Sequence, residues 1–255
     1  MCLITFAFQM HPEYPLIVIA NRDEFYDRPT APAQFWADAP EILAGRDLLQ
    51  GGSWLGVSSK NRFAAITNYR DPRLPESGLY SRGDIVRQFL EQPVSIEAFI
   101  AHLRNTKDDY GGYNVLLYDG HKMYHFNNIF DDYTIIEAGV HSLSNATLNS
   151  NWPKTQLGKD DLTEVLKVKQ PLQIENLLSL LTNKTIASDN KLPDTGVGIH
   201  LERLLSPQFI KMGNYGTRCS TAILFQQDGN IQFAERTYEQ GEKEYDRLFI
   251  IEKNR

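Results

Sequence analysis

Long apolar runs are absent from this chain of 255 residues. LIVIA at 16–20 and LFII at 248–251 are strand-sized, and neither approaches the ~20 residues needed to span a bilayer. The N-terminus starts with apolar residues but has no basic region and no small-residue cleavage site, so it does not resemble a signal peptide. We therefore expect a cytoplasmic protein without stable membrane insertion.

Runs of lysine and arginine are also absent, and the formal net charge is −6. Proteins that bind nucleic acids or anionic membranes present clustered positive charge. We therefore expect no nucleic-acid partner. A small-molecule substrate or an amphipathic cargo remains compatible with this charge.

Cysteine and clustered histidine are scarce. Cys2 and Cys219 can form only one bridge, and two thiols in a cytosolic chain of this size are more simply read as reduced. His121 and His125 are four residues apart, but in a strand they do not share a face as helical zinc ligands do. We expect no metal site.

A linker rich in glycine, proline or serine is absent too, so we expect one domain over residues 1–255. Strand-like runs occupy residues 3–9, 16–21, 62–69, 113–120, 122–128, 135–145, 220–226, 231–238 and 247–253. Helical patterns occupy residues 81–92, residues 95–105 with a Ser95 cap, and most of 152–210. Strands at both ends with helices between them predict an α+β fold of antiparallel sheets covered by helices.

The position of Cys2, directly after the initiator methionine, is unusual in a chain with so little cysteine. Methionine removal generally proceeds when the next side chain is small. It would leave Cys2 with a free α-amine beside its thiol, which is a nucleophile with a built-in base.

Four polar residues, Asn21 to Glu24, follow the apolar run at 16–20. If residues 3–9 and 16–21 form a hairpin, this cluster lies near Cys2. An arginine such as Arg22 favours a thiolate, and a carboxylate can orient an α-ammonium group. The alternative is a solvated turn with a surface ion pair.

Several motifs resemble those of the NRDE family, also called the transport and Golgi organisation 2 family. In order along the chain they are ANRDEFYDRPT, GGSWLGVS, AAITNYR, SRGD, YNVLLYD, LSNATLNSNWPK and RCSTAILF. The family is similar to the N-terminal-nucleophile hydrolases. This resemblance implies a four-layer αββα sandwich of two antiparallel sheets.

Within that superfamily the chain most resembles the cysteine group that includes choloylglycine hydrolases and penicillin acylases. The resemblance implies that Cys2 is the nucleophile and that Arg22 accompanies it. That group has the spacing Arg-x-x-Asp, whereas Phe25 stands at the aspartate position here. Either Asp23 or Glu24 is left to contact the α-amine.

The same resemblance implies two asparagines and a late arginine. Asn68 follows a predicted strand, and Asn145 matches the asparagine that donates to a developing oxyanion. The late arginine is Arg218 or Arg203. Asparagine is also favoured where strands end, so a purely structural role for both asparagines is the alternative.

The glycine-rich stretch at 50–58 has no phosphate-loop pattern, and Gly51 and Gly52 are expected to form a tight turn. That turn would lay Trp54 over a pocket or over the core. The residues expected to contact a substrate are Asn21, Glu24, Phe25, Trp54 and Tyr69. Trp36, Trp152 and Tyr26 are further candidates for an apolar pocket, and ordinary core packing is the alternative for each of these aromatic residues.

Two functions follow. In the first, Cys2 hydrolyses a non-peptide amide bond of a small molecule, and no cofactor is required. In the second, the fold carries haem, acyl-CoA or another lipid without turnover, as the family resemblance also implies. Cys2, Met10, His11 and His141 are then candidate haem ligands, and retention of Met1 favours this alternative.

Overall fold

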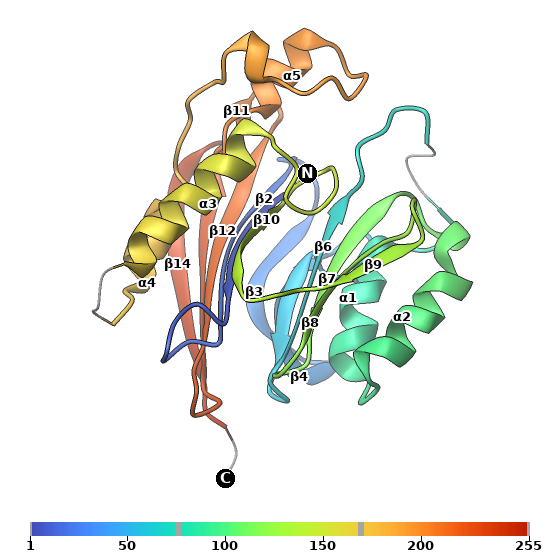
Figure 1. Cartoon of the computed structure of the whole chain (residues 1–255), viewed down its shortest axis with the longest axis vertical. Coiled ribbons are helices and arrows are strands. Elements are labelled where there is room, and N and C mark those ends of the chain that lie inside the picture. Colours follow the sequence, from blue (N-terminus) through green and yellow to red (C-terminus); the bar gives the residue numbers. More distant parts are fainter. Residues whose placement is uncertain (1, 75–77, 168–170, 254–255) are drawn as a thin grey trace. The chain divides into compact units, whose positions relative to one another are not determined.

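The computed structural model describes residues 2–74, 78–167 and 171–253, and the chain divides into two compact units. Unit 1 combines the N-terminal segment, up to Asp27, with Ala138–Ile251. Unit 2 is formed by Arg28–Glu137 together with Glu252 and Lys253. Each unit contains an antiparallel sheet with helices packed against one face (Figure 1). The protein is therefore an α+β protein with two antiparallel sheets, and the four-layer order stays a prediction.

The sheet of unit 1 has the strand order β10-β1-β2-β12-β13-β14, and β11 pairs with β12. Its strands are β1 (Cys2–Phe8), β2 (Leu16–Phe25), β10 (Gly139–Leu143), β11 (Lys211–Met212), β12 (Tyr215–Phe225), β13 (Ile231–Glu239) and β14 (Glu242–Ile251). The first strand is thus built into the sheet between β10 and β2. Cys2, the first residue of β1, pairs directly with Arg22 of β2, and the pairing of β1 with β10 begins two residues later at Ile4.

Three helices belong to unit 1: α3 (Pro153–Leu166), α4 (Ile174–Ser179) and α5 (Ile199–Leu205). Side chains alternate between the two faces of a strand, so every second residue of β1, β2 and β12 faces α3 and α4. These residues and the helices share one buried apolar cluster: Ala7, Tyr14, Ile17, Ile19, Leu162, Leu172, Leu177, Leu178, Leu181, Ala222, Leu224 and Ala234.

Helix α3 lies close against β1. A Cβ atom on Gly158 would come within 2.5 Å of Thr5 Oγ1, so this glycine permits the close approach. One turn later, Leu162 shares the buried cluster with Ala7. The helix therefore runs alongside β1 in the same direction, with its first turn near the amino end of the strand.

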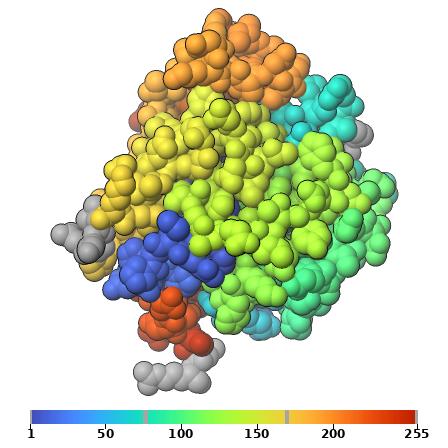
Figure 2. All heavy atoms as spheres, viewed as in Figure 1, coloured from blue at the N-terminus to red at the C-terminus, as the bar shows by residue number. Residues whose placement is uncertain are grey.

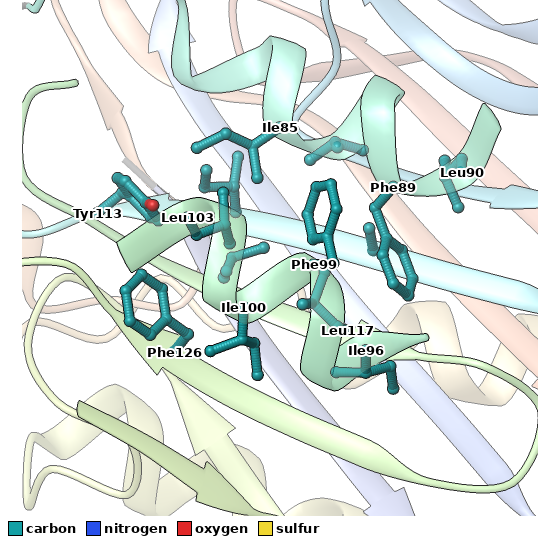
Figure 3. Close-up of a cluster of buried hydrophobic side chains, with 14 of the residues drawn as sticks. Ile85, Phe89, Leu90, Ile96, Phe99, Ile100, Leu103, Tyr113, Leu117 and Phe126 are labelled. Carbon is teal, nitrogen blue, oxygen red and sulfur yellow. The ribbon is translucent and has the colours of Figure 1, made fainter. Parts of the chain in front are cut away.

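The sheet of unit 2 follows the sequence order from β3 to β9. Its strands are β3 (Thr30–Trp36), β4 (Ala39–Asp47), β5 (Leu55–Ser58), β6 (Arg62–Asn68), β7 (Tyr113–Tyr118), β8 (Met123–Asn127) and β9 (Asp132–Ile135). Helices α1 (Arg82–Glu91) and α2 (Ile96–Asn105) cover one face. Figure 3 shows their apolar side chains, including Phe89, Phe99 and Ile100, packed together with Tyr113 and Phe126 of the strands.

The ends of α1 and α2 show why these segments are helical. Ser81 Oγ accepts the N–H of Gly83, and Ser95 Oγ accepts the N–H of Ala98, so both helices have serine N-caps. The predicted Ser95 cap is therefore confirmed. Two single turns of 3-10 helix, at Lys107–Asp109 and Asp189–Lys191, complete the described helical elements.

One expectation about the elements was wrong, and three strands were not expected. Residues 135–145 are not one strand, because β9 ends at Ile135 and β10 begins at Gly139 in the other sheet. Strands β3, β4 and β5 were not expected, and β3 pairs irregularly, with register shifts between Ala31 and Gln34 and between Phe35 and Trp36. In 152–210 the three expected helical stretches are confirmed as α3, α4 and α5, and irregular backbone with one 3-10 turn separates α4 from α5. Within the described residues, no helix is long and apolar enough to cross a membrane.

Candidate active site

The register of three neighbouring strands brings the candidate residues into one row. Cys2 of β1 pairs with Arg22 of β2, and Arg22 pairs with Cys219 of β12. Residues directly opposite each other in antiparallel strands point to the same face of the sheet. Arg22 therefore lies between the two cysteines, on the face opposite α3.

The neighbours of Arg22 point the other way because side chains alternate along β2. Asn21 and Asp23 therefore face the helices of unit 1. Asp23 lies one residue beyond the Cys2–Arg22 pair, just past the amino end of β1. The carboxyl group thus sits beside the first residue of the strand, where an α-amine of Cys2 would be.

The surroundings of Cys2 favour the protonated thiol over the thiolate. The residue is half-buried, and burial raises the pKa of its thiol. The charge of Asp23 also raises it, whereas Arg22 and the backbone N–H of Asp23 lower it. Since the net direction is upward, the thiol needs a proton acceptor before it can act as a nucleophile.

The side chain of Asp23 is held in a defined position. Thr217 donates its hydroxyl proton to Asp23 Oδ1 across 2.7 Å and accepts the N–H of Ile210 across 2.9 Å. Burial raises the pKa of the Asp23 carboxyl, and the charges of Lys154 and Arg22 oppose this shift. The Tyr215 hydroxyl donates to the Asp23 backbone carbonyl across 2.9 Å, which fixes the main chain at the same point.

Glu24 and Phe25 have different surroundings from Asp23. Glu24 Oε1 accepts the N–H of Phe25 across 2.9 Å, so this carboxylate folds back onto its own strand. The Phe25 side chain is 53% exposed and touches the edge of the Tyr215 ring. Of the two acidic candidates for contact with an α-amine, Asp23 is the buried one.

Asn21 ties β2 to the segments packed above it. Its amide nitrogen donates to the carbonyls of Leu181 and Gln208 across 2.9 and 2.8 Å. Its amide oxygen accepts the Ser220 hydroxyl across 2.5 Å. These bonds give Asn21 an anchoring position on the helix-facing side, and its role as a substrate contact stays a prediction.

Asn145 lies near Cys2 because β10 pairs with β1. Ser144 Oγ donates to the Cys2 carbonyl across 3.0 Å, and its distance to Asn145 Oδ1 is 3.3 Å. Both residues are fully buried. The loop after β10 therefore carries the asparagine to the same end of the sheet as Cys2.

The two candidates for the late arginine differ in position. Arg218 stands at the register shift of β12, and its guanidinium donates to the carbonyls of Phe25 and Tyr26 across 2.8 and 3.0 Å. Burial and the nearby charge of Arg22 lower its pKa. Arg203, on α5, forms an exposed ion pair with Asp189 across 2.6 Å. The arginine close to Arg22 is Arg218.

The remaining candidates belong to unit 2. Asn68 is the last residue of β6 and its side chain is exposed. Tyr69 follows it and meets the edge of the Phe130 ring, with 5.6 Å between the centroids. The carbonyl of Trp54 accepts the N–H of Ile66 across 2.8 Å. The roles of these residues at the site stay predictions.

Of the other aromatic candidates, Trp36 is buried and its indole N–H donates to the carbonyl of Ala44 across 3.1 Å, so it is a core residue. Trp152 precedes α3 as its N-cap. Tyr26 follows β2, and its hydroxyl lies against Gly216.

The glycine pair at 51 and 52 shapes a turn, as expected. Gly51 has φ of 80°, and its N–H donates to Asp47 across 2.8 Å. Gly52 packs against the backbone of Gly83 in α1, where a Cβ atom would overlap it. The GGSW and SRGD motifs therefore meet in unit 2.

Sequence reasoning missed two residues of the site. Cys219 is 4% exposed, and burial raises its thiol pKa well above the usual value, with Glu235 adding to the shift. Lys154 is 3% exposed, and its charge acts on Asp23. Both residues stood in quoted motifs, but only the strand register and the packing of α3 bring them to the site.

The four candidate haem ligands lie apart: Cys2 begins β1, Met10 and His11 follow that strand, and His141 belongs to the neighbouring strand β10. The loop between β1 and β2, blue in Figure 2, carries Met10, which is 47% exposed, and His11, whose ring packs on Tyr14. His141 is opposite Phe6 and stacks on its ring. Among the residues that the structure describes, no three His, Cys, Asp or Glu side chains gather as a metal site.

The profile of the family described as "Transport and Golgi organisation 2" matches residues 1–240. The human "Transport and Golgi organization protein 2 homolog" is 33% identical, over 93% of each chain. The Drosophila melanogaster "Transport and Golgi organization protein 2" is 25% identical, over 93% of this chain and 92% of that protein.

Among solved structures, the Caenorhabditis elegans N-acylethanolamine-hydrolyzing acid amidase ortholog is similar, with a TM-score of 0.49 and 9% identity. The similarity covers 88% of this chain and 92% of that one. The family match and the human relative both extend over nearly the whole sequence. The chain belongs to the Transport and Golgi organisation 2 family.

Proposed function

We propose that this protein is an N-terminal cysteine amidohydrolase that cleaves a linear or cyclic non-peptide amide bond of a small molecule. One observation carries the proposal: Cys2 begins a strand that is paired on both sides, opposite Arg22 and beside the buried carboxyl of Asp23. Removal of Met1, a residue outside the described range, would expose the α-amine at this point.

The protonation of the thiol and of the α-amine supports the proposed hydrolysis. The thiol is protonated at rest because burial raises its pKa, so it needs a base close by. An α-amine has a reference pKa of ~7.7–8.0 and can accept that proton at neutral pH. The thiolate then attacks the amide carbon, and the resulting α-ammonium returns the proton to the departing amine.

Hydrolysis of the thioester completes the cycle. Water gives one proton to the α-amine and bonds to the acyl carbon, the C–S bond breaks, and the proton returns to sulphur. In both halves of the reaction the oxyanion needs donors. Asn145 supplies an amide group from the β10 end, and Arg22 supplies positive charge from the neighbouring strand. Arg218 orders the backbone after β2.

Carriage of haem or a lipid is the other function that the family resemblance implies. The candidate haem ligands do not converge: Met10 and His11 follow the far end of β1, roughly 20 Å of strand from Cys2. No contact of the described residues favours carriage, and we retain it as the alternative that the experiment separates from hydrolysis.

The test is the intact mass of untagged protein before and after brief treatment with iodoacetamide. We expect a mass without methionine and one fast adduct, mapped to Cys2. Cys2→Ala should abolish the adduct and leave the fold intact. Cys219→Ala is the matched control, and it should retain the adduct because Cys219 is buried.

Two results would contradict the proposal. One is a retained methionine with an inert Cys2, and a saturable shift of the haem absorption band would then favour carriage. The other is unchanged amide hydrolysis by Cys2→Ala, once a substrate has been found by screening acyl amides.

A further inference from the structure

Lys154 is a buried cation whose charge acts on Asp23, and the proposed mechanism gives it no role. It lies in the first turn of α3 and is 3% exposed. A lysine is almost never buried to this extent unless its charge is compensated. The burial of this ammonium group therefore indicates that a negatively charged or polar partner lies close to it.

Helix packing shows where that place is. Gly158 rests on Thr5, and Lys154 precedes Gly158 by four residues, which is ~6 Å along the helix. Since α3 runs in the direction of β1, this step leads from Thr5 to Leu3, which is two residues or ~6.6 Å along the strand. Leu3 pairs with Asn21 of β2, and Asp23 lies beyond it on the same face.

The electrostatics agree with this placement. After the cost of burial, the charge of Lys154 is the largest influence on the Asp23 carboxyl, and it favours the ionised form. Among the described residues, the other titratable groups that interact with Asp23 are Arg22 of β2, the Cys2 thiol of β1 and Tyr26 after β2. Lys154 is the contribution from α3.

We propose that Lys154 is a positioning residue that shares the Asp23 carboxylate with the α-amine of processed Cys2, so that the amine remains a free base for the thiol proton. The inference rests on the proposed function, because it requires removal of Met1. A carboxylate alone would hold the α-amine as an ammonium ion. A second cation at the same carboxylate reduces that hold through charge repulsion.

The proton transfer from the thiol to the α-amine creates one negative and one positive charge. The thiol proton moves to the uncharged nitrogen, which gives a thiolate and an ammonium group. Asp23 then faces two cations, Lys154 and the new ammonium, and the thiolate lies beside Arg22. Lys154 touches neither the sulphur nor the substrate in this scheme, so its effect passes through Asp23.

The test measures the condensation of 2-cyanobenzothiazole with untagged protein between pH 5.5 and 9. This probe forms a stable product only with an N-terminal cysteine: the thiol adds to the nitrile carbon, the amine closes the ring and ammonia leaves. In Lys154→Met the midpoint of the pH profile should rise by about one unit, which lowers the rate near pH 7 about tenfold. Asp23→Asn should move the midpoint downward.

Two variants serve as references. Lys154→Arg keeps the charge and should restore the wild-type midpoint. Lys167→Met removes an exposed lysine just after α3 that pairs with Glu164 on the surface, and should leave the profile unchanged. If Lys154 and Asp23 had purely structural roles, Lys154→Met and Asp23→Asn would not shift the midpoint of the pH profile in opposite directions.

The outcomes separate the two proposals. Absence of condensation in every protein, wild type included, overturns the amidohydrolase and this inference with it. Condensation of the wild type with an unchanged midpoint in Lys154→Met overturns only the role of Lys154. If Lys154→Met does not fold, an unchanged midpoint in Asp23→Asn also overturns the role of Lys154, because that role acts through Asp23.

Discussion

Two thiols flank Arg22, and their surroundings give them different reactivities. Cys2 is half-buried at the start of a strand, whereas Cys219 is buried in the middle of the sheet beside Glu235. Burial and a neighbouring carboxylate both disfavour a thiolate. Selective modification of Cys2 therefore needs no special affinity of the reagent, because the second thiol is protected by its position.

A buried histidine in unit 2 gives a prediction about pH. His125 is 5% exposed, its Nε2 lies 2.9 Å from Asn114 Oδ1, and burial lowers its pKa to about 4. In the unfolded chain histidine titrates near ~6.5, so between these values the unfolded state binds the extra proton. The stability that a neutral His125 allows is complete above pH ~6.5 and falls as the pH drops towards 4.

The expected loss between pH 7 and pH 4.5 is about 2–3 kcal/mol in the free energy of unfolding. Urea denaturation at the two pH values measures it. His125→Gln should flatten the pH dependence, and His121→Gln, at an exposed position, should not. An identical slope in His125→Gln and wild type would contradict the assignment.

At the scale of elements, the contact between the β4–β5 turn and α1 is a second point of sensitivity. Ser53 donates its N–H to the Gly83 carbonyl across 3.2 Å, and Gly52 leaves no room for a Cβ atom at this approach. Gly52→Ala must move backbone, not a flexible side chain. We expect a destabilisation of about 1–3 kcal/mol, measured by thermal or urea unfolding.

The neighbouring glycine supplies the control. Gly51 has a positive φ but nothing within 4 Å of its Cβ direction, and asparagine tolerates that conformation. Gly51→Asn should therefore cost clearly less than Gly52→Ala. Equal losses would mean that backbone conformation, and not the contact with α1, determines the effect.

Local patterns in the sequence predicted some elements well and others not at all. The Ser95 cap and the apolar spacing of Ile96, Phe99, Ile100 and Leu103 gave α2 almost to the residue, because both signals are local. Strand β3 escaped because proline and polar residues interrupt it and its pairing with β4 is irregular.

The candidate site was predictable to the same extent. The hairpin argument brought Cys2 next to Arg22 because only a short turn separates their strands. The hairpin argument did not find Cys219 or Lys154. Cys219 reaches the site because β12 pairs with β2, which is more than a hundred residues away in the sequence, and Lys154 reaches it through the packing of α3 on β1. No local period encodes such contacts.

At the scale of the whole molecule, each hydrophobic core draws on one unit. The cluster under α3 and α4 contains residues of unit 1, and the cluster under α1 and α2 contains residues of unit 2. A core truncation in one unit should therefore loosen that unit first.

Ile19→Ala tests this independence. Ile19 is fully buried in β2, and its truncation should cost about 2–5 kcal/mol. Hydrogen exchange followed by mass spectrometry should show faster exchange in β1, β2 and β12 than in wild type, with β6, β7 and β8 still protected. Phe99→Ala in α2 is the reciprocal variant, and a uniform loss of protection in either protein would show a single cooperative unit.

Unit 1 is built from two segments of the chain that Arg28–Glu137 separates, and this separation affects the order in which its strands are synthesised. The ribosome makes β1 and β2 first, then all of Arg28–Glu137, and only afterwards β10 and β12, the strands that enclose the hairpin. At usual translation rates the wait for β12 is on the order of tens of seconds. During that interval the hairpin has no sheet to enter, so the peptidase that the proposed function requires would have time to act before the sheet forms around Cys2.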